Sequence, residues 1–313
     1  MSLLSFTRAF VRALAPNFAE AALRADATLP AISSALAAVQ HAAYVSALRA
    51  ALPEGGVTEL PAAPGCADSC FLEDAAVVIG GRALISNPGA PSRRGEVAGV
   101  RAALESAGIT ISAVMPADGR ATLDGGDVLW TGREVFVGLG ARTNGAGAEA
   151  LRAAFPGVRV STISLAALGE EVIRAERARL AHKTAAGLRA KIARTPLHLK
   201  SIASVVGEDT VAVPNSPLGR ALAHALADAS GVPKALRAAG KKLAFVMVPE
   251  EDAAAANAVL VNDTLLIRSA GDAPGAAKEL GEYARAVGLK PVELNMSEIA
   301  KADGALSCCS ILI

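Results

Sequence analysis

Aromatic side chains are scarce in this chain of 313 residues: they make up 3% of it, while hydrophobic residues as a whole make up 52%. Small aliphatic side chains on sheets and helices must therefore fill most of the interior. A chain of this length and hydrophobic content can bury a large core in one domain or two, which excludes an intrinsically disordered protein.

An excess of either charge is also missing, since 31 lysine and arginine residues balance 30 aspartate and glutamate residues. Nucleic acids and anionic membranes bind proteins that carry a basic surplus. We therefore expect no nucleic acid and no membrane as partner. A small polar molecule is left as the expected ligand, and the sequence leaves open whether the protein is a monomer or a homo-oligomer.

Long hydrophobic runs are absent, because stretches such as 243–248 are interrupted well before the ~20 residues that cross a bilayer. Four cysteines are too few for a disulfide framework in a chain this long, and the spacing of Cys66 and Cys70 does not match half of a structural zinc site. These absences predict a soluble protein in a reducing compartment, the cytoplasm. Arg8 and Arg12, with no acid before Glu20, leave a targeting segment open as the alternative to a first strand at 7–14.

Four stretches each contain two apolar segments joined by a tight polar or glycine-containing turn, which is typical of β-hairpins. They span 75–85, 127–137, 202–213 and 258–267. A helix-like segment and another apolar strand follow most of them, at 93–107 and 110–114, at 144–154 and 158–161, and at 273–287 and 291–294. A unit that recurs at a period of roughly 50 residues predicts a radial or stacked repeat.

The repeat has one interruption and two unpaired ends. A charged helical stretch at 168–194 lengthens one period, and we expect an insertion there that serves as a lid, an oligomer contact or a solvated decoration. The strand at 7–14 and the strand at 310–313 each stand alone. Pairing them would cover an exposed edge, complete a fifth unit and close a ring, with residue 308 near the ring axis.

An activated-thiol site needs a cysteine, a histidine and an acid, and the sequence holds a candidate for each. Cys308 precedes the apolar C-terminal strand, His198 lies between apolar residues, and Asp124 belongs to the LDGGD loop at 123–127. Each has a plainer alternative: a core thiol, a hydrogen-bonded core histidine or an ordinary turn. Their occurrence together favours the catalytic interpretation.

Carboxylates gather in the DSCFLED segment at 68–74, just before an apolar strand. Such acids are costly to bury unless they are paired, so Asp68, Glu73 and Asp74 form either a solvated loop end or a receptor for a cation. A guanidinium is the natural guest, because it donates two parallel hydrogen bonds to a carboxylate.

Two arginines lie at expected helix starts, where the helix dipole disfavours cations. Arg93 follows Ser92, the predicted N-cap of one helix, and Arg142 precedes the start of the next. Each is either a surface ion-pair residue or part of a receptor for a carboxylate, since a helix start with an arginine binds anions well.

These motifs resemble the dimethylarginine dimethylaminohydrolase family of the guanidino-modifying, or pentein, superfamily. The PGAPSRR string together with the terminal CCS is the specific combination, whereas arginine deiminases share the double-glycine acid loop. Asn87 departs from the family pattern, which commonly has arginine before PGAP. The matching stretches run across most of the chain and are FLED (71–74), NPGAPSRRGEV (87–97), LDGGDVL (123–129), VGL (137–139), RTN (142–144), LHLKS (197–201) and DGALSCCS (303–310).

The resemblance implies an α/β fold, a single five-bladed propeller domain over 1–313 built from ββαβ repeats, with the insertion at about 168–194. It implies Cys308 as the nucleophile, His198 as general acid and base, and Asp124 as the acid that orients the imidazole. The substrate-binding residues that it implies are Asp68 and Glu73 for the guanidinium, Asp74 in support, Arg93 and Arg142 for the carboxylate, and Leu23 and Ala302 for backbone groups or pocket walls.

The activity that the resemblance implies is hydrolysis of methylated arginines to citrulline and an amine, through a covalent intermediate on Cys308. No redox cofactor or metal is required, although Cys308 could bind an inhibitory zinc ion. An arginine deiminase-like or other guanidine hydrolase is the nearest alternative, and a non-catalytic binder of arginine derivatives is a further one.

Overall fold

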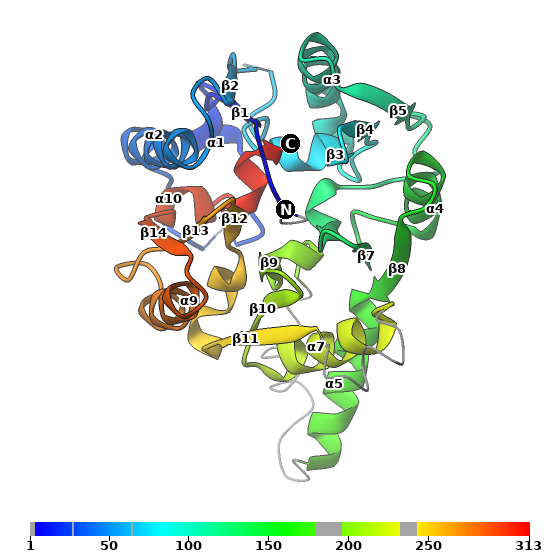
Figure 1. The fold of residues 1–313 in the computed structure, drawn as a ribbon, viewed down its shortest axis with the longest axis vertical. Helices are drawn as coiled ribbons and strands as arrows, with labels where there is room; N and C mark the ends of the chain where they lie inside the picture. Colours follow the sequence, from blue (N-terminus) through cyan, green and yellow to red (C-terminus); the bar gives the residue numbers. More distant parts are fainter. Residues whose placement is uncertain (1–3, 27, 64, 180–195, 232–242) are drawn as a thin grey trace.

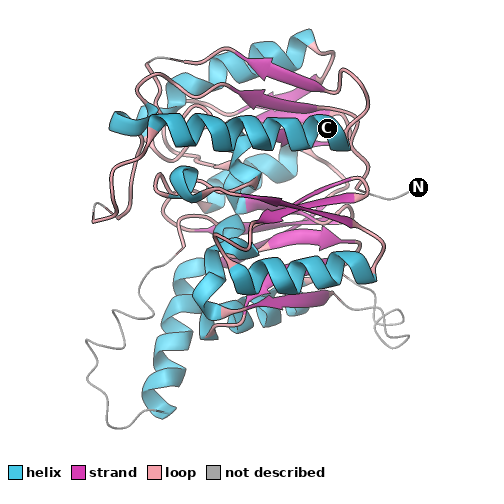
Figure 2. Cartoon of the chain, turned by 90° about the vertical axis from the view of Figure 1, so that its left-hand side faces the viewer, coloured by secondary structure: helices cyan, strands magenta, loops and turns pink. Residues whose placement is uncertain are grey.

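The computed structural model describes the whole chain except residues 1–3, 27, 64, 180–195 and 232–242. The described strands form five three-stranded sheets. Figure 1 shows these sheets as the blades of a ring with helices at its periphery, and the side view of Figure 2 shows helices lying in front of the strands. The predicted five-bladed α/β propeller is confirmed.

Four blades share one topology, in which two antiparallel strands are followed by a helix and by a third strand that pairs parallel with the second. The first blade contains β3 (Ala76–Ile79), β4 (Arg82–Ile85), α3 (Val97–Ser106) and β5 (Thr110–Val114). The second contains β6 (Val128–Trp130), β7 (Glu134–Leu139), α4 (Gly145–Ala154) and β8 (Arg159–Ser164). The third contains β9 (Ser204–Gly207), β10 (Thr210–Pro214), α7 (Pro217–Ala229) and β11 (Ala244–Val248), and the fourth contains β12 (Val259–Val261), β13 (Thr264–Arg268), α9 (Pro274–Ala286) and β14 (Lys290–Leu294).

The hairpin turns of these blades use residues that tolerate a left-handed backbone. The φ angles are 58° at Gly80, 73° at Gly81, 89° at Gly132, 54° at Asp209 and 56° at Asn262. Glycine adopts such angles freely, and aspartate and asparagine do so more readily than other residues. All four hairpins expected from the sequence are therefore present, with their turns where the sequence placed them.

The two ends of the chain form the fifth blade, called the closing blade below. In it β1 (Ala9–Arg12) pairs antiparallel with β15 (Ile311–Leu312) and parallel with β2 (Val57–Leu60). Figure 1 shows the red C-terminal segment beside the blue N-terminal one. The predicted pairing of the two ends is confirmed. Neither β2 nor the helix that leads to it, α2 (Ser34–Ala51), was expected from the sequence. Ser33 caps α2 by accepting a hydrogen bond from Leu36.

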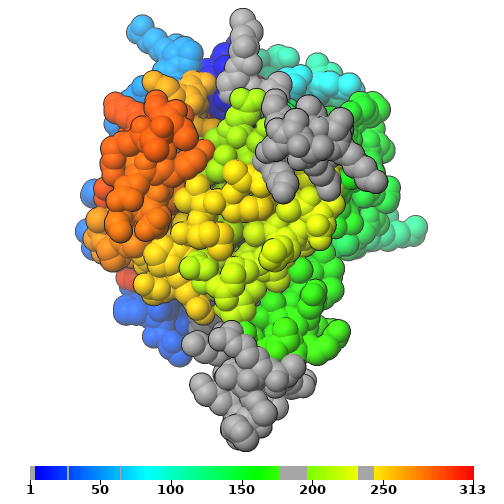
Figure 3. Space-filling view, turned by 60° about the horizontal axis from the view of Figure 1, so that its bottom comes forward, coloured from blue at the N-terminus to red at the C-terminus, as the bar shows by residue number. Residues whose placement is uncertain are grey.

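Small aliphatic side chains pack one blade against the next. One buried cluster joins Val206 and Ala212 of the third blade to Leu265 and Ala276 on the fourth blade. Figure 3 shows these two blades side by side on the surface, the third in yellow-green and the fourth in orange. A chain with few aromatic residues thus builds its core from many short contacts between sheets.

The helix start expected at Ser92 is wrong. A 3-10 helix, η2 (Pro91–Glu96), occupies this position, its N-cap is Ala90, and the α-helix α3 begins only after it. The 3-10 turn buries Arg93, which is 4% exposed, inside the protein. The next helix does begin as expected, because the side chain of Asn144 caps α4 by accepting a hydrogen bond of 2.9 Å from Gly147.

The helix α5 (Leu165–Arg179) confirms helical structure in the first part of the predicted insertion. It extends away from the ring in Figures 1 and 2 and is anchored by the buried side chains of Leu168 and Val172. Residues 180–194 lie outside the described part of the chain, so the role of the insertion and the single-domain assignment stay predictions. None of the helices in the described ranges has the length and apolar character needed to span a membrane.

Ring closure should contribute measurably to stability. Ile311 in β15 is 5% exposed and packs with Phe10 and Leu72 in one apolar cluster. We expect Ile311→Ala to lower the free energy of unfolding by about 2–4 kcal/mol, because it removes buried methyl groups and leaves a cavity. Val114→Ala is the control, since Val114 likewise lies at one end of a strand, β5, but is 47% exposed. Urea denaturation measures both, and equal losses would contradict a stabilising closing blade.

Candidate active site

A cavity of about 250 Å³ brings together segments that lie far apart in the sequence. We call it the Cys308 cavity. Eight of the ten residues singled out from the sequence line it: Leu23, Asp68, Asp74, Arg93, Arg142, His198, Ala302 and Cys308. The other two, Asp124 and Glu73, lie behind its wall.

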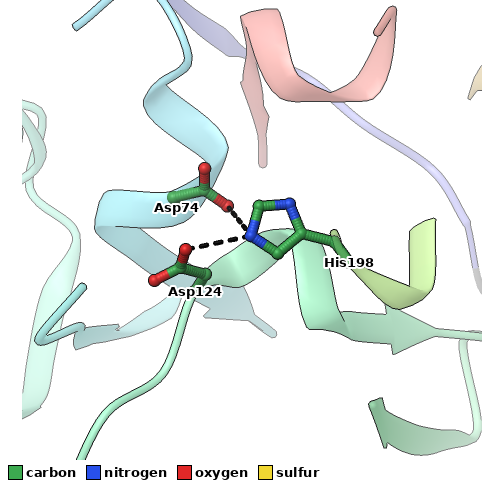
Figure 4. Close-up of side chains that lie close together, drawn as sticks. All are labelled: Asp74, Asp124 and His198. Atoms are coloured by element: carbon green, nitrogen blue, oxygen red, sulfur yellow. Dashed lines mark hydrogen bonds and ion pairs between the residues drawn. The ribbon is translucent and has the colours of Figure 1, made fainter. Parts of the chain in front are cut away.

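His198 is held by a carboxylate from behind the cavity. The residue stands just before the 3-10 helix η4 (Leu199–Ser201), and its Nε2 lies 2.9 Å from Oδ2 of Asp124 and 4.0 Å from Oδ1 of Asp74 (Figure 4). Asp124 is fully buried, and its Oδ1 accepts a hydrogen bond of 2.8 Å from the N–H of Gly89. Asp124 therefore does not line the cavity itself and acts on it through the imidazole of His198.

Both glycines of the LDGGD loop are needed because there is no room for a side chain at either position. A Cβ on Gly126 would lie 2.8 Å from Nδ1 of His198 and 2.9 Å from Oδ1 of Asp74, and a Cβ on Gly125 would collide with the carbonyl oxygen of Glu73. The N–H of Gly126 donates a hydrogen bond of 2.9 Å to Asp74. Glycine at these positions lets the backbone approach the histidine and its acids closely.

The charge on His198 is stabilised strongly. Burial disfavours the imidazolium, but the negative charge of Asp74, the hydrogen bond that the imidazolium donates to Asp124 and the charge of Asp127 outweigh it and raise the pKa of His198 to about 9. Burial likewise disfavours the ionised form of Asp74, yet His198 and Arg93 hold its pKa below the usual value, at about 2. At neutral pH the site therefore contains an imidazolium next to an ionised carboxylate.

Cys308 lies in the 3-10 helix η6 (Ser307–Cys309) and is half-buried at the cavity. Burial, followed by the negative charges of Glu73 and Asp74, raises the pKa of its thiol well above the usual value. The thiol is thus protonated at neutral pH in this arrangement. A cation placed beside the carboxylates would offset their charge and favour the thiolate.

Asp68 accepts hydrogen bonds from the N–H of Leu23, 3.1 Å to one carboxylate oxygen and 3.3 Å to the other. Burial raises its pKa above the usual value, although Leu23, Arg93 and Arg142 favour its ionised form. Asp68 and Asp74 are the two carboxylates among the predicted residues that face the cavity.

Glu73 faces a different space. It lines a second cavity of about 170 Å³, called the axial cavity below, together with Lys200, Ser307 and mainly apolar side chains. One oxygen of Glu73 accepts from the Lys200 ammonium at 2.5 Å, and the other accepts from the Ser307 hydroxyl at 2.9 Å. The carboxylate expected to bind a guanidinium directly is therefore already engaged on the far side of the wall.

The two predicted carboxylate-binding arginines differ in their partners. Arg93 forms buried ion pairs with Asp74 and Glu96, so its charge is already balanced. Arg142 is 16% exposed, and its Nη1 lies 3.8 Å from Asp124 without a hydrogen-bond partner in the described structure. Of the two, Arg142 has the capacity to bind a further anion.

Sequence reasoning missed several partners of these residues. Lys200 stands in the LHLKS motif, two residues after His198, and Glu96 stands three residues after Arg93, but neither received a role. The spacing from Arg93 to Glu96 is that of a helical ion pair, which was a usable signal. Nothing in the sequence indicated that Lys200 pairs with Glu73, because that contact joins two blades.

Three of these side chains lie close enough together to share a metal ion. Within the described ranges, Asp74, Asp124 and His198 each offer one ligand atom, all within 4.8 Å of one another (Figure 4). Cys308 is not part of this group, so its capture of an inhibitory zinc ion stays a prediction. Arg93 and Gly126 already occupy the oxygens of Asp74, which makes this group a charge cluster rather than a vacant metal cage.

No family model matches the sequence. Among curated proteins, the chain is 34% identical to N(G),N(G)-dimethylarginine dimethylaminohydrolase of Streptomyces coelicolor over 307 residues, covering 97% of this chain and 96% of the relative. It is 32% identical to the human protein DDAH2, named only as a hydrolase, covering 92% and 88% of the two chains. The solved structure of a Pseudomonas aeruginosa DDAH variant with citrulline, 23% identical, superposes with a TM-score of 0.74 over 99% of this chain and 100% of that chain, which shows the shared fold.

The pKa of His198 provides a test of the charge cluster. We expect Asp74→Asn to lower the pKa of His198 from about 9 toward the ordinary imidazole value, because it removes the largest favourable charge beside the ring. An NMR titration of the imidazole protons measures it. Asp118→Asn, at an exposed loop position, should leave the titration unchanged. An unshifted pKa in the Asp74 variant would contradict the arrangement.

Proposed function

Because the chain belongs to the dimethylarginine dimethylaminohydrolase family, we propose that it hydrolyses asymmetric dimethylarginine and monomethylarginine to citrulline, releasing dimethylamine or methylamine. The observation that carries this proposal is the cavity that Cys308 and His198 share with Asp68 and Asp74. Such a site joins a nucleophile and a proton donor to a receptor for a cation, which is the chemistry that a guanidinium requires.

We assign the guanidinium to Asp68 and Asp74, the two carboxylates singled out from the sequence that line the cavity; Asp303 lines it as well, but its Oδ2 accepts a hydrogen bond from the Ala25 N–H. Ionised Asp74 attracts the cation, and the cation in turn lowers the pKa of the Cys308 thiol by offsetting the charges that raise it. Substrate binding thus helps to generate the thiolate, and the thiol proton is lost to solvent. Glu73 acts from behind the wall through its charge and through its bonds to Lys200 and Ser307.

The Cys308 thiolate then attacks the guanidinium carbon and forms a tetrahedral adduct. His198, an imidazolium at neutral pH, donates a proton to the departing amine, so the C–N bond breaks and a thiouronium intermediate stays on the sulfur. The neutral imidazole next accepts one proton from water as the oxygen attacks the same carbon. The C–S bond then breaks, which returns the thiolate and releases citrulline, and the remaining proton of the added hydroxyl passes to solvent, where the free amine takes it up. Asp124 fixes the ring and stabilises its charge in both steps.

Arg142 is the group that we assign to the α-carboxylate of the substrate, because its Nη1 lies buried at the cavity without a hydrogen bond to the described residues. Leu23 and Ala302 form further walls of the same cavity. Arg93, already paired with Asp74 and Glu96, acts by fixing Asp74.

We place the enzyme in the reducing cytoplasm, which the four free cysteines support. Adjacent Cys308 and Cys309 stay unlinked, as the thiolate mechanism requires.

The substrate assignment is tested by incubating the purified protein with asymmetric dimethylarginine, monomethylarginine and arginine and measuring citrulline. We expect turnover of both methylated substrates in preference to arginine. Cys308→Ser should abolish it, while Cys66→Ser, at a half-buried thiol outside the cavity, should retain it. Turnover of arginine alone would replace the proposal by a deiminase, and binding without any citrulline would indicate a non-catalytic binder.

The assignment of Arg142 predicts an effect that depends on the substrate's carboxylate. Arg142→Ala should reduce kcat/KM for asymmetric dimethylarginine by about tenfold to a hundredfold, because a charge-assisted hydrogen bond contributes about 1.5–3 kcal/mol. The same change should have little effect on the decarboxylated analogue of that substrate. Arg120→Ala is the control, since Arg120 is exposed and outside the cavity. Equal losses on both substrates would contradict carboxylate binding by Arg142.

A further inference from the structure

Three turns form the wall between the two cavities, and each presents one residue to either side. The turns are η1 (Leu72–Ala75), η6, and η4 together with His198, the residue before it. Asp74, Cys308 and His198 line the Cys308 cavity, whereas their close neighbours Glu73, Ser307 and Lys200 line the axial cavity. The position of each reacting group is thus fixed by a neighbour on the other side of the wall.

Those neighbours are joined in a closed ring of hydrogen bonds by Asn257. Its Nδ2 donates to the Lys200 carbonyl at 2.8 Å and to the Ser307 hydroxyl at 2.9 Å. Its Oδ1 accepts from the Ser307 N–H at 3.0 Å. The Ser307 hydroxyl donates to Glu73, and Glu73 accepts from the Lys200 ammonium, which closes the ring.

The amide of Asn257 has one orientation that fits these partners. The Lys200 carbonyl can only accept and the Ser307 N–H can only donate, so the NH₂ and the oxygen cannot exchange places. Asn257 is 1% exposed, follows the 3-10 helix η5 (Glu250–Ala256) and precedes β12 of the fourth blade. A buried amide with its polar atoms engaged is a rigid connection, because breaking it would leave unpaired polar groups.

We propose that Asn257 is a positioning residue that holds the Cys308 turn and the His198 turn at a fixed separation. The inference rests on the proposed function for its kinetic readout. Asn257 lines neither cavity and contacts no group that we assign to the substrate. It acts through Ser307 on the sulfur and through the Lys200 backbone on the imidazole, so its loss should impair the chemical step more than substrate binding.

The test compares steady-state kinetics of the full chain and its Asn257→Ala variant on asymmetric dimethylarginine. We expect kcat to fall about tenfold to a hundredfold with KM changed by no more than about threefold, since a misplacement of about 1 Å has an effect of that size. Alkylation of Cys308 by iodoacetamide, followed by the mass of its peptide, is the second readout. It should become faster, because a loosened η6 exposes the thiol.

Ser204→Ala is the matched control. Ser204 is 1% exposed, and its hydroxyl bonds the same chain segment, donating to the Ala256 carbonyl at 2.6 Å and accepting from the Ala258 N–H at 3.0 Å. It has no bond to Ser307 or Lys200 among the contacts described. This variant should lose stability, as measured by urea denaturation, while its kcat and its Cys308 alkylation rate stay close to those of the parent.

Asn257→Asp gives an independent, pH-dependent readout. Burial should raise the pKa of the introduced carboxyl group, which can donate a hydrogen bond only when it is protonated. The ratio of variant to parent kcat should therefore rise as the pH is lowered, with both proteins folded by circular dichroism. If Asn257→Ala does not fold, this variant still tests whether Asn257 positions the two turns.

Three outcomes would overturn the proposal: a folded Asn257→Ala variant with kcat within about twofold of the parent, an equal kcat loss in Ser204→Ala, or a flat pH ratio for Asn257→Asp. Failure of the parent to hydrolyse methylated arginines would instead refute the proposed function. The alkylation comparison would still show whether Asn257 positions the thiol.

Discussion

The buried contact between His198 and two carboxylates is the constraint on which the rest of the site depends. An imidazolium that is 5% exposed would be too costly without Asp124 at 2.9 Å and Asp74 at 4.0 Å. Asp74 in turn depends on Arg93, and Arg93 on Glu96. The charges alternate in sign from the cavity to the first blade, so each one is buried only because the next is present.

Ring closure makes this arrangement possible. Cys308 lies just before β15, and the strand to which β15 pairs in the described structure is β1, from the other end of the chain. The acids come from the turn before β3 and from the loop before β6, and the histidine comes from the segment before β9. The segments that lead into the first, second, third and closing blades therefore bring their chemical groups to one site, with no long loop needed.

The sequence predicted the blades because each hairpin combines a period-two apolar pattern with a turn residue such as Gly132 or Asn262 that tolerates positive φ. It missed α2, whose alanine-rich sequence carries little contrast between its faces, although Ser33 marked its start. The prediction that Ser92 caps an α-helix was wrong because proline and serine also occur at the start of a 3-10 helix, which is what forms at this position. Eight of the ten residues singled out share one cavity, yet only contacts between blades reveal that the charge of Arg93 is already balanced while Arg142 is available.

Neighbours in the sequence divide between two cavities, and this limits what any motif can assign. Glu73 and Asp74 are chemically alike and adjacent, but a 3-10 turn rotates successive side chains by about a third of a turn, so they point to different spaces. Ser307 and Cys308 differ in the same way. A motif records that both members of a pair are present, whereas the fold decides which one meets the substrate and which one supports it. Two of the supporting residues, Lys200 and Ser307, form hydrogen bonds with Asn257. For that reason a residue outside every recognised motif can set the geometry of the reaction.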